Sequence, residues 1–521
     1  MDKKSKFIGF LTNFIVFTLC FSGALVMFGA YWVAKTFGTT DFAQIVFHLR
    51  FPLLDENTPF VASFIAKVIM PSLVLSFFIA FTPLCIQFLR WFYEVIVLKL
   101  CYKTIILKFF YGFVLSQKAK AAKFVFALAL FALFLNITNN KLKITRYLNT
   151  QETYSTLYEE HYKPFDTAIL ANFTPKQNLI IILAESLEST FSAKNIPYSQ
   201  GGGGEFSPFG ELIPNLTNLA LKNTNFSATS ALGGITETFG TGWTIAGTIG
   251  HLCAVPLNTP LAPNNFNNKH FLSSATCVSD ILQDLGYTQI YFSGLDAQFA
   301  GTKFFFEAHG VEVRDLAYLW AQNLLPKQLP TNLRGFWDVK DAKVFEFTKD
   351  YINSATEPFA LYISTIDTHA QTGFVDKEYC QNTENSYQGA ITCTDQIIND
   401  FVKFVEQSKF KDNTTIIILG DHLSMAQNFF PPQTNRAIYN AFINPKFTQQ
   451  ATKELTKNRT LSHFDIAPLI LNSVGIEVRE FGLGRNPLYE KTLLESNLTL
   501  PELDKALRQR SKIYDSFWEV K

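Results

Sequence analysis

Two adjacent side chains with strong chemistry follow a short apolar run near residue 420. Residues 415–419 are a β-branched stretch of the kind that forms a buried strand. The run ends at Gly420 and is followed at once by Asp421 and His422. A carboxylate and an imidazole can bind a metal ion or move a proton. The pair could equally be a polar loop in which the two residues adjoin by chance, so its meaning depends on the rest of the chain.

A second carboxylate ends an earlier apolar run, in the segment LAESLEST, where Glu185 follows the stretch 178–184. An ionised carboxylate at a partly buried strand end is costly without a partner or a metal. Glu185, Asp421 and His422 together would supply two carboxylates and one imidazole. This mixture of oxygen and nitrogen donors suits Zn²⁺ or Mn²⁺ better than Ca²⁺, with Mg²⁺ as a third candidate.

A hydroxyl that could act as a nucleophile or a further ligand is expected between these two strands. The segment 239–257, FGTGWTIAGTIGHLCAVPL, places hydroxyls after glycines and continues with small residues that a helix accepts. At a helix N-terminus the backbone N–H groups attract a phosphate and stabilise the charge of an alkoxide. The alternative is a glycine-rich turn whose threonines are only helix caps.

The elements that must position these residues alternate between strand and helix. Short β-rich runs followed by polar or glycine-containing turns occur within 178–191, 288–301, 358–374 and 413–425, and helical patterns occur within 274–286 and 393–410. This alternation predicts an α/β fold with a mainly parallel sheet and helices on both faces. Ligands of such sheets bind beyond the carboxyl ends of the strands. The polar residues expected there are Glu185, Asp367, His369, Asp421 and His422.

The N-terminal part of the 521-residue chain predicts a membrane region. Apolar runs cover residues 7–36, 60–89 and 124–137, and each is read as a membrane helix. The first run is too long for a signal peptide and lacks a small-residue cleavage site. The chain holds 45 basic and 44 acidic residues, a net charge of +1, which gives no sign of a nucleic-acid partner.

Basic residues predict the orientation of these helices. The N-terminal MDKKSK and the stretch 90–123 should stay in the cytoplasm, so three crossings place everything after about residue 139 on the outer side. Lys99, Lys103 and Lys108 favour an amphipathic helix on the inner surface, whereas a fourth span within 91–115 would reverse the orientation. The expected division is a transmembrane domain at 1–139, a connecting segment at 140–176 along the membrane surface, and a catalytic domain at 177–521.

Four of the seven cysteines lie in the polar part of the chain and form two local couples, Cys253 with Cys277 and Cys380 with Cys393. Such couples favour disulfides in an oxidising compartment such as a periplasm. Four separate buried thiols are the alternative.

Five segments carry a family resemblance, in the same order and over about residues 178–488: LAESLESTF, GTGWTIAG, DTHAQTGF, GDHLSM and FGLGRNPL. They resemble the family of phosphoglycerol transferase I and lipoteichoic acid synthase, in the sulfatase/alkaline phosphatase superfamily. The resemblance implies one divalent metal held by Glu185, Asp421, His422 and a nucleophilic threonine. Thr241 is the better match, because its distance to Pro256 is that of the synthase, and Thr244 is the runner-up.

The resemblance also implies roles around the phosphoryl group. His369 would protonate the leaving alcohol. The Arg and Trp that surround glycerol phosphate in the synthase have no counterpart, and Lys303 in FAGTK is offered instead. His251 could line the same cleft, and Arg485 in GLGRNPL could contact acceptor or phosphate, or simply hold a loop.

The function that the resemblance implies is transfer of the head group of phosphatidylglycerol to a cell-envelope glycan through a phosphothreonine. The enzyme would be a multi-pass protein of a bacterial inner membrane with its catalytic domain in the periplasm, close to its lipid donor. Phosphoethanolamine transfer from phosphatidylethanolamine to lipid A or a glycan is the nearest alternative. A periplasmic phosphodiesterase or sulfatase-like hydrolase is another, although GTGWT lacks the modified Cys or Ser of sulfatases. The last alternative is a membrane protein without enzymatic activity whose metal has a structural role.

Overall fold

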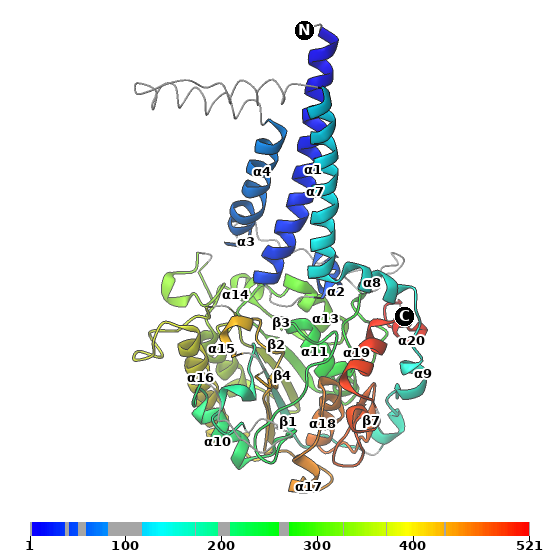
Figure 1. Cartoon of the computed structure of the whole chain (residues 1–521). Coiled ribbons are helices and arrows are strands. Elements are labelled where there is room, and N and C mark those ends of the chain that lie inside the picture. Colours follow the sequence, from blue (N-terminus) through cyan, green and yellow to red (C-terminus); the bar gives the residue numbers. More distant parts are fainter. Residues whose placement is uncertain are drawn as a thin grey trace. The chain divides into compact units, whose positions relative to one another are not determined.

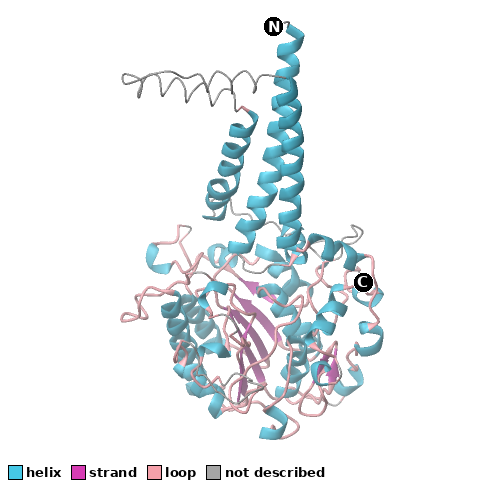
Figure 2. Ribbon diagram, viewed as in Figure 1, coloured by secondary structure: helices cyan, strands magenta, loops and turns pink. Residues whose placement is uncertain are grey.

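A computed structural model describes residues 3–36, 41–50, 59–81, 117–171, 173–195, 209–259, 270–326, 328–370, 372–431, 434–496 and 498–519 (Figures 1 and 2). The chain divides into two compact units, one of residues 1–42 and 54–148 and the other of residues 43–53 and 149–521. The amphipathic helix expected around Lys99, Lys103 and Lys108 lies outside the described residues.

The first unit contains long apolar helices. They are α1 (Lys3–Thr36), α3 (Pro59–Phe64), the π-helical turn η1 (Ile65–Ile69), α4 (Met70–Ala80) and α7 (Gln117–Leu142). Within the described residues, three stretches are long and apolar enough to cross a membrane, Phe7–Thr36, Val61–Ala80 and Lys120–Leu142, each with a mean hydropathy of 2.0. They overlap the three runs expected from the sequence, although residues 82–89 of the second run lie outside the described residues. The short helices α2 (Phe42–Arg50) and α8 (Ile144–Gln151) lie where the chain passes between the two units.

The second unit is built on a six-stranded sheet. Its strands are β1 (Asn178–Ala184), β2 (Thr288–Phe292), β3 (Glu312–Arg314), β4 (Phe359–Ser364), β5 (Thr414–Gly420) and β6 (Asn440–Ile443). Their spatial order is β3-β2-β4-β1-β5-β6, and every pairing is parallel except that of β5 with β6. All residues of β1, β4 and β5 are buried, because helices cover both faces of the sheet. The mainly parallel α/β sheet predicted from the sequence is confirmed.

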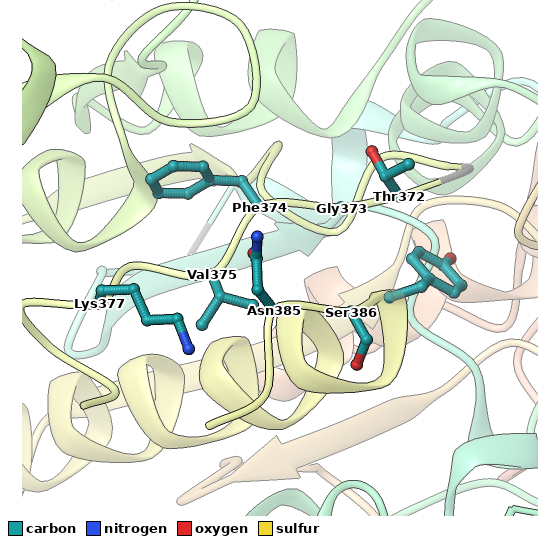
Figure 3. A pocket seen from close by; sticks show the side chains of 8 residues that line it. Thr372, Gly373, Phe374, Val375, Lys377, Asn385 and Ser386 are labelled. Carbon is teal, nitrogen blue, oxygen red and sulfur yellow. The ribbon is translucent and has the colours of Figure 1, made fainter. Parts of the chain in front are cut away.

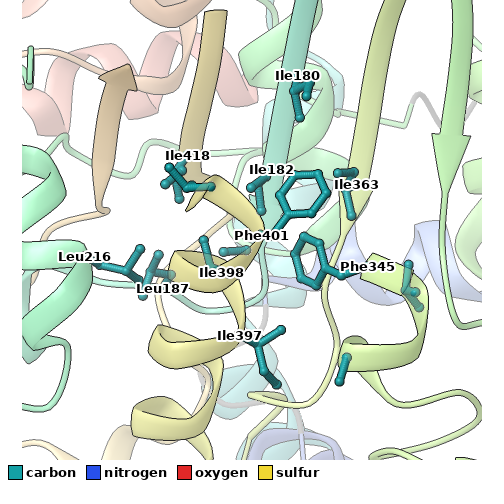
Figure 4. Close-up of a cluster of buried hydrophobic side chains, with 14 of the residues drawn as sticks. Ile180, Ile182, Leu187, Leu216, Phe345, Ile363, Ile397, Ile398, Phe401 and Ile418 are labelled. Atoms are coloured by element: carbon teal, nitrogen blue, oxygen red, sulfur yellow. The ribbon is translucent and has the colours of Figure 1, made fainter. Parts of the chain in front are cut away.

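Helices occupy both sides of this sheet. Figure 1 shows α10 (Pro214–Lys222), α15 (Asp341–Ser354) and α16 (Tyr387–Gln407) on one side, and α11 (Thr244–Cys253) and α18 (Ile466–Ser473) on the other. On the α15–α16 side, Phe345 and Phe401 pack against strand residues such as Ile182 and Ile363 (Figure 4). The remaining helices of this unit are α9 (Leu157–His161), α12 (Val278–Asp284), α13 (Thr302–Ala308), α14 (Leu316–Ala321), α17 (Lys453–Thr456), α19 (Leu500–Arg508) and α20 (Lys512–Ser516), and a small hairpin joins β7 (Glu480–Phe481) to β8 (Gly484–Arg485).

Both cysteine couples expected from the sequence are disulfides. Cys253–Cys277 ties the end of α11 to the residue that caps α12, and Cys380–Cys393 ties a loop to α16. Each bond removes freedom from the unfolded chain and so favours the folded state. Two of the helices that surround the candidate site are therefore covalently anchored.

Candidate metal centre

Two neighbouring strands deliver the candidate ligands to one point. In the parallel pair of β1 and β5, Ala184 lies opposite Gly420, so the next residues, Glu185 and Asp421, leave the sheet side by side. Glu185, Asp421 and His422 each offer a ligand atom, and these atoms all lie within 4.8 Å of one another. All three side chains are buried. Residues separated by more than 230 positions in the sequence are thus brought together by strand register.

The His422 ring is oriented toward the two carboxylates. Its Nδ1 lies 2.8 Å from the carbonyl oxygen of Leu423, which makes Nδ1–H the donor and leaves a lone pair on Nε2. Nε2 lies 3.5 Å from Glu185 Oε1 and 3.5 Å from Asp421 Oδ2. Neither Nε2 nor Asp421 Oδ2 makes a hydrogen bond. Buried lone pairs that face one another without a proton donor need a cation between them, and this donor set fits a divalent metal.

The electrostatics of the cluster favour positive charge. Burial by itself lowers the pKa of His422, but the carboxylates of Asp421 and Glu185 raise it well above its ordinary value. For Glu185, burial raises the pKa, and the neighbouring His422 overcomes this and lowers it. The two carboxylates thus favour positive charge at this point, and the same field would stabilise a metal cation there.

Of the two candidate threonines, the structure brings Thr244 to the cluster and turns the Thr241 hydroxyl away. Thr244 Oγ1 donates a hydrogen bond to Glu185 Oε2 at 3.1 Å. Thr241 Oγ1 donates to the carbonyl of Thr238 at 2.8 Å and accepts from the Thr238 N–H at 3.2 Å. The helix α11 begins at Thr244, after an extended Trp243, so Thr244 stands at the helix N-terminus while Thr241 closes the preceding turn. This placement differs from the expectation, which favoured Thr241.

Close backbone contact fixes α11 against the end of β5. A Cβ on Gly247 would lie 1.9 Å from the carbonyl oxygen of Asp421, so only glycine fits at this helical position. The first turn of α11, which carries Thr244, is therefore held directly beside the backbone of the candidate ligands.

Two buried imidazoles contact the backbone at the end of β5. The Nε2 atoms of His251 and His463 lie 3.0 Å and 2.8 Å from the carbonyl oxygens of Gly420 and Asp421, and the two rings stack with centroids 4.4 Å apart. Burial lowers the pKa of both, to about 4 for His251, so both are neutral and donate through Nε2. His251 is thus a support of the strand end, whereas the sequence suggested a residue lining the cleft.

His369 lies close enough to Glu185 for their charges to interact. Burial lowers its pKa, while the charge of Glu185 opposes that change. Its Nδ1 lies 2.8 Å from the carbonyl of Ala370, so Nδ1 carries the hydrogen and Nε2 is available to exchange a proton. The ring packs against Trp337, with centroids 4.5 Å apart, and against Phe336 at 4.9 Å. Trp337 is an aromatic neighbour of His369 that was not predicted from the sequence. The segment GFWDVKD is the sequence feature that could have pointed to it.

Asp367 has a different task from the three candidate ligands. Its Oδ1 accepts from the N–H of Phe336 and its Oδ2 from the N–H of Asp341, both at 2.9 Å. Both of its carboxylate oxygens are therefore used to hold the segment that carries Trp337.

The other residues nominated from the sequence make contacts elsewhere. Lys303 on α13 pairs with Glu307 at 3.9 Å. Arg485 pairs with Glu480 at 2.8 Å, and its guanidinium also donates to the carbonyl of His161 at 2.6 Å. Arg485 therefore holds a loop, one of the two roles that the sequence left open.

Buried acids that the sequence reading did not identify hold the loop after His422. Glu188 accepts from the N–H of Ser424 at 2.9 Å and forms an ion pair with Arg436. Glu237 accepts from the N–H of Leu423 at 2.8 Å. These contacts fix the loop that follows the candidate ligands.

A second group with ligand chemistry is Cys277, Asp280 and His309. Cys277 is bonded to Cys253, so its sulfur is not available as a thiolate ligand. Among the described residues, the cluster of Glu185, Asp421 and His422 is then the metal candidate in which no ligand atom is blocked by a covalent bond.

Comparisons with known proteins identify the family of this chain. The family model "Sulfatase" matches residues 177–476, more than half of the chain. "Phosphoglycerol transferase I" of Xanthomonas axonopodis pv. citri is 32% identical over 264 residues, covering 48% of this chain and 34% of that relative. The protein of the same name from Salmonella choleraesuis is 28% identical over 342 residues, covering 63% and 41%. The matched part thus spans only about a third to two fifths of the length of these curated relatives.

Solved structures with a similar backbone include two transferases. The phosphoglycerol transferase GacH of Streptococcus pyogenes has 16% identity and a TM-score of 0.42, over 70% of this chain and 89% of that one. The lipooligosaccharide phosphoethanolamine transferase EptA of Neisseria meningitidis has 12% identity and a TM-score of 0.46, over 96% and 87%. The match of the family model to residues 177–476 shows that the chain belongs to the sulfatase family.

Proposed function

We propose that this protein is a membrane-anchored phosphoglycerol transferase that uses Thr244 as its nucleophile. The observation that carries the proposal is the hydrogen bond from Thr244 Oγ1, at the N-terminus of α11, to Glu185 in the cluster with Asp421 and His422. The name phosphoglycerol transferase I on the relatives at 28–32% identity supports the choice of reaction.

In the first half of the reaction, Thr244 Oγ attacks the phosphorus of the phosphatidylglycerol head group. A bond forms between Oγ and phosphorus, the bond from phosphorus to the diacylglycerol oxygen breaks, and glycerophosphoryl-threonine remains. The net proton movement is from the Thr244 hydroxyl to the departing diacylglycerol. Glu185 Oε2 accepts the hydrogen bond of that hydroxyl, and His369 is the group proposed to deliver a proton to the leaving oxygen.

Glu185, Asp421 and His422 would hold one divalent cation, with Mn²⁺ and Zn²⁺ as the main candidates and Mg²⁺ as the third. When bound, such an ion lowers the pKa of a coordinated hydroxyl and neutralises charge on the phosphoryl oxygens. The N-terminal N–H groups of α11 add a second positive field at the same point.

In the second half of the reaction, a hydroxyl of a cell-envelope glycan attacks the phosphothreonine and receives the glycerophosphoryl group. Thr244 then regains its proton from the acceptor hydroxyl. We place this chemistry in the periplasm of a bacterial cell, at the inner membrane that contains the donor lipid. The three helices of membrane-crossing length and the two disulfides support that location.

The test is to incubate the purified full chain with vesicles of phosphatidylglycerol or phosphatidylethanolamine, each labelled in its head group, with and without a chelator. We expect diacylglycerol release from phosphatidylglycerol that stops with chelator and returns with Mn²⁺ or Zn²⁺. Release from phosphatidylethanolamine alone would replace the donor with the alternative one. If glycans are present and the labelled head group is hydrolysed without joining any of them, the protein is a hydrolase. Absence of diacylglycerol release from either lipid would overturn the proposal.

A further inference from the structure

A pocket lies beside the segment that leads away from His369. It has a volume of about 610 Å³ and is lined by Thr372, Gly373, Phe374, Val375, Lys377, Asn385, Ser386 and Tyr387 (Figure 3). The size falls within the range of small-molecule sites. Figure 3 shows that one wall is the loop after His369, while the other is the N-terminal end of α16 with Asn385 and Ser386.

Both walls of the pocket are connected to the candidate catalytic residues. The N–H of Gly373 donates to the carbonyl of His369 at 3.1 Å. On the other wall, the hydroxyl of Tyr387 lies 2.5 Å from Ser424 Oγ, two residues after His422. The pocket therefore lies at the same edge of the sheet as the metal centre, following β4 on one side and facing the loop after β5 on the other.

The pocket walls are held in place before any ligand arrives. The disulfide Cys380–Cys393 closes the segment that contains Asn385 and Ser386. The N–H of Phe374 donates to the carbonyl of Asp367 at 2.7 Å, and Asp376 pairs with Lys340 at 2.9 Å in a buried position. A pre-formed site loses little conformational entropy on binding, which matters most for a weakly binding polar ligand.

The chemistry of the lining suits a neutral polyhydroxylated ring. Thr372 and Ser386 supply hydroxyls, Asn385 supplies an amide, and none of the lining residues is a carboxylate. The one charged lining residue is Lys377, whose ammonium group donates to the carbonyl of Thr383. Phe374 is half-buried, so part of its ring remains open to a ligand. The C–H face of a sugar packs on an aromatic ring while its hydroxyls bond to amide and hydroxyl groups.

We propose that this pocket is the acceptor subsite and that it binds a neutral sugar unit of the glycan. This inference rests on the proposed transferase function and names the class of its second substrate. In the step that the pocket serves, a sugar hydroxyl oxygen bonds to the phosphorus, the bond from phosphorus to Thr244 Oγ breaks, and the hydroxyl proton passes to Oγ. Gly373, which lines the pocket, is hydrogen-bonded through its backbone to His369, the group that would take part in that proton transfer.

The experiment separates the two half-reactions in the full chain. Vesicles of head-group-labelled phosphatidylglycerol are mixed with neutral glucose oligosaccharides of two to seven units, and both diacylglycerol release and label on sugar are measured. We expect Asn385→Ala and Phe374→Ala each to lower the ratio of sugar product to released diacylglycerol by about tenfold, as loss of a binding contact predicts. Asn382→Ala is the matched control, because Asn382 is an exposed asparagine of the same disulfide loop but does not line the pocket.

Each other outcome has a defined meaning. Unchanged ratios in both pocket variants would overturn the subsite, while diacylglycerol release by the wild type would still support the transferase. Release without label on any oligosaccharide would overturn the neutral-sugar assignment alone. Variants that reduce release itself in proportion to transfer would show that the pocket holds the glycerol of the donor. Absence of release in the wild type would instead remove the proposed function on which the inference rests.

Discussion

At the scale of single residues, the proposed nucleophile is the hydroxyl that contacts the carboxylate of Glu185. Thr244 does so from the first turn of α11, and Thr241 is satisfied by the backbone of Thr238. The two threonines are three residues apart, so they form a natural matched pair for mutation.

We expect Thr244→Ala to reduce diacylglycerol release by at least about 10³-fold, because it removes the nucleophile itself. Thr241→Ala should keep the rate within about tenfold and instead cost about 1 kcal/mol of folding free energy, through the lost bond to Thr238. Rates from labelled phosphatidylglycerol and thermal melts check both statements. If Thr241→Ala abolished diacylglycerol release and Thr244→Ala kept it, Thr241 would be the nucleophile instead.

Metal removal gives a second prediction at this scale. A saturating divalent ion at 100 times its Kd should stabilise the fold by about 2.7 kcal/mol, so chelation should lower the Tm by several degrees. Asp421→Asn should abolish this difference between loaded and chelated protein. Asp367→Asn, a buried acid at the same sheet edge whose oxygens bind backbone N–H groups, should keep it. If chelation lowered the Tm of both variants by the same amount, the ion would bind at a site other than Asp421.

At the scale of elements, the close approach of α11 to the end of β5 positions the site. The strands and the polar residues at their ends could be predicted from the sequence, because β-branched runs that end in glycine or acid are distinctive. The choice between Thr241 and Thr244 could not, because it depends on a helix that starts one turn later and no local signal marks that start. Trp337 was missed because a loop, with no periodicity of its own, brings it to His369.

We expect Gly247→Ala to push α11 away from Asp421, since the added Cβ would lie 1.9 Å from a carbonyl oxygen. The result should be a loss of activity of about 10²-fold or more and a loss of about 1–3 kcal/mol in stability. Gly29→Ala makes the same change in α1, where the nearest atom is Val68 Cγ1 at 3.9 Å, and should leave both quantities nearly unchanged. Full activity in Gly247→Ala would show that α11 is not rigidly placed.

At the scale of the whole molecule, the chain combines an apolar helical unit with a sulfatase-family unit. Hydropathy alone located the three helices of membrane-crossing length, because a continuous run of about twenty apolar residues matches the thickness of the hydrocarbon core. The positive-inside pattern predicts that the second unit lies outside the cytoplasm. Disulfides in that unit fit an oxidising compartment.

Protease added to intact spheroplasts should therefore digest residues 149–521 without cell lysis, while a tag at the N-terminus remains protected. The reason is that the proposed three crossings, an odd number, would put the two ends on opposite sides of the membrane. Protection of the C-terminal unit until lysis would mean an even number of crossings and would remove access to a periplasmic acceptor.

The most direct test of the central claim is to trap the covalent intermediate. The full chain is mixed with phosphatidylglycerol labelled in its glycerol, quenched in acid without acceptor, digested, and sequenced by fragmentation mass spectrometry across residues 239–257. We predict glycerophosphate on Thr244, present with divalent metal and absent after chelation. Label on Thr241, on another side chain, or on none while diacylglycerol is released would contradict the account.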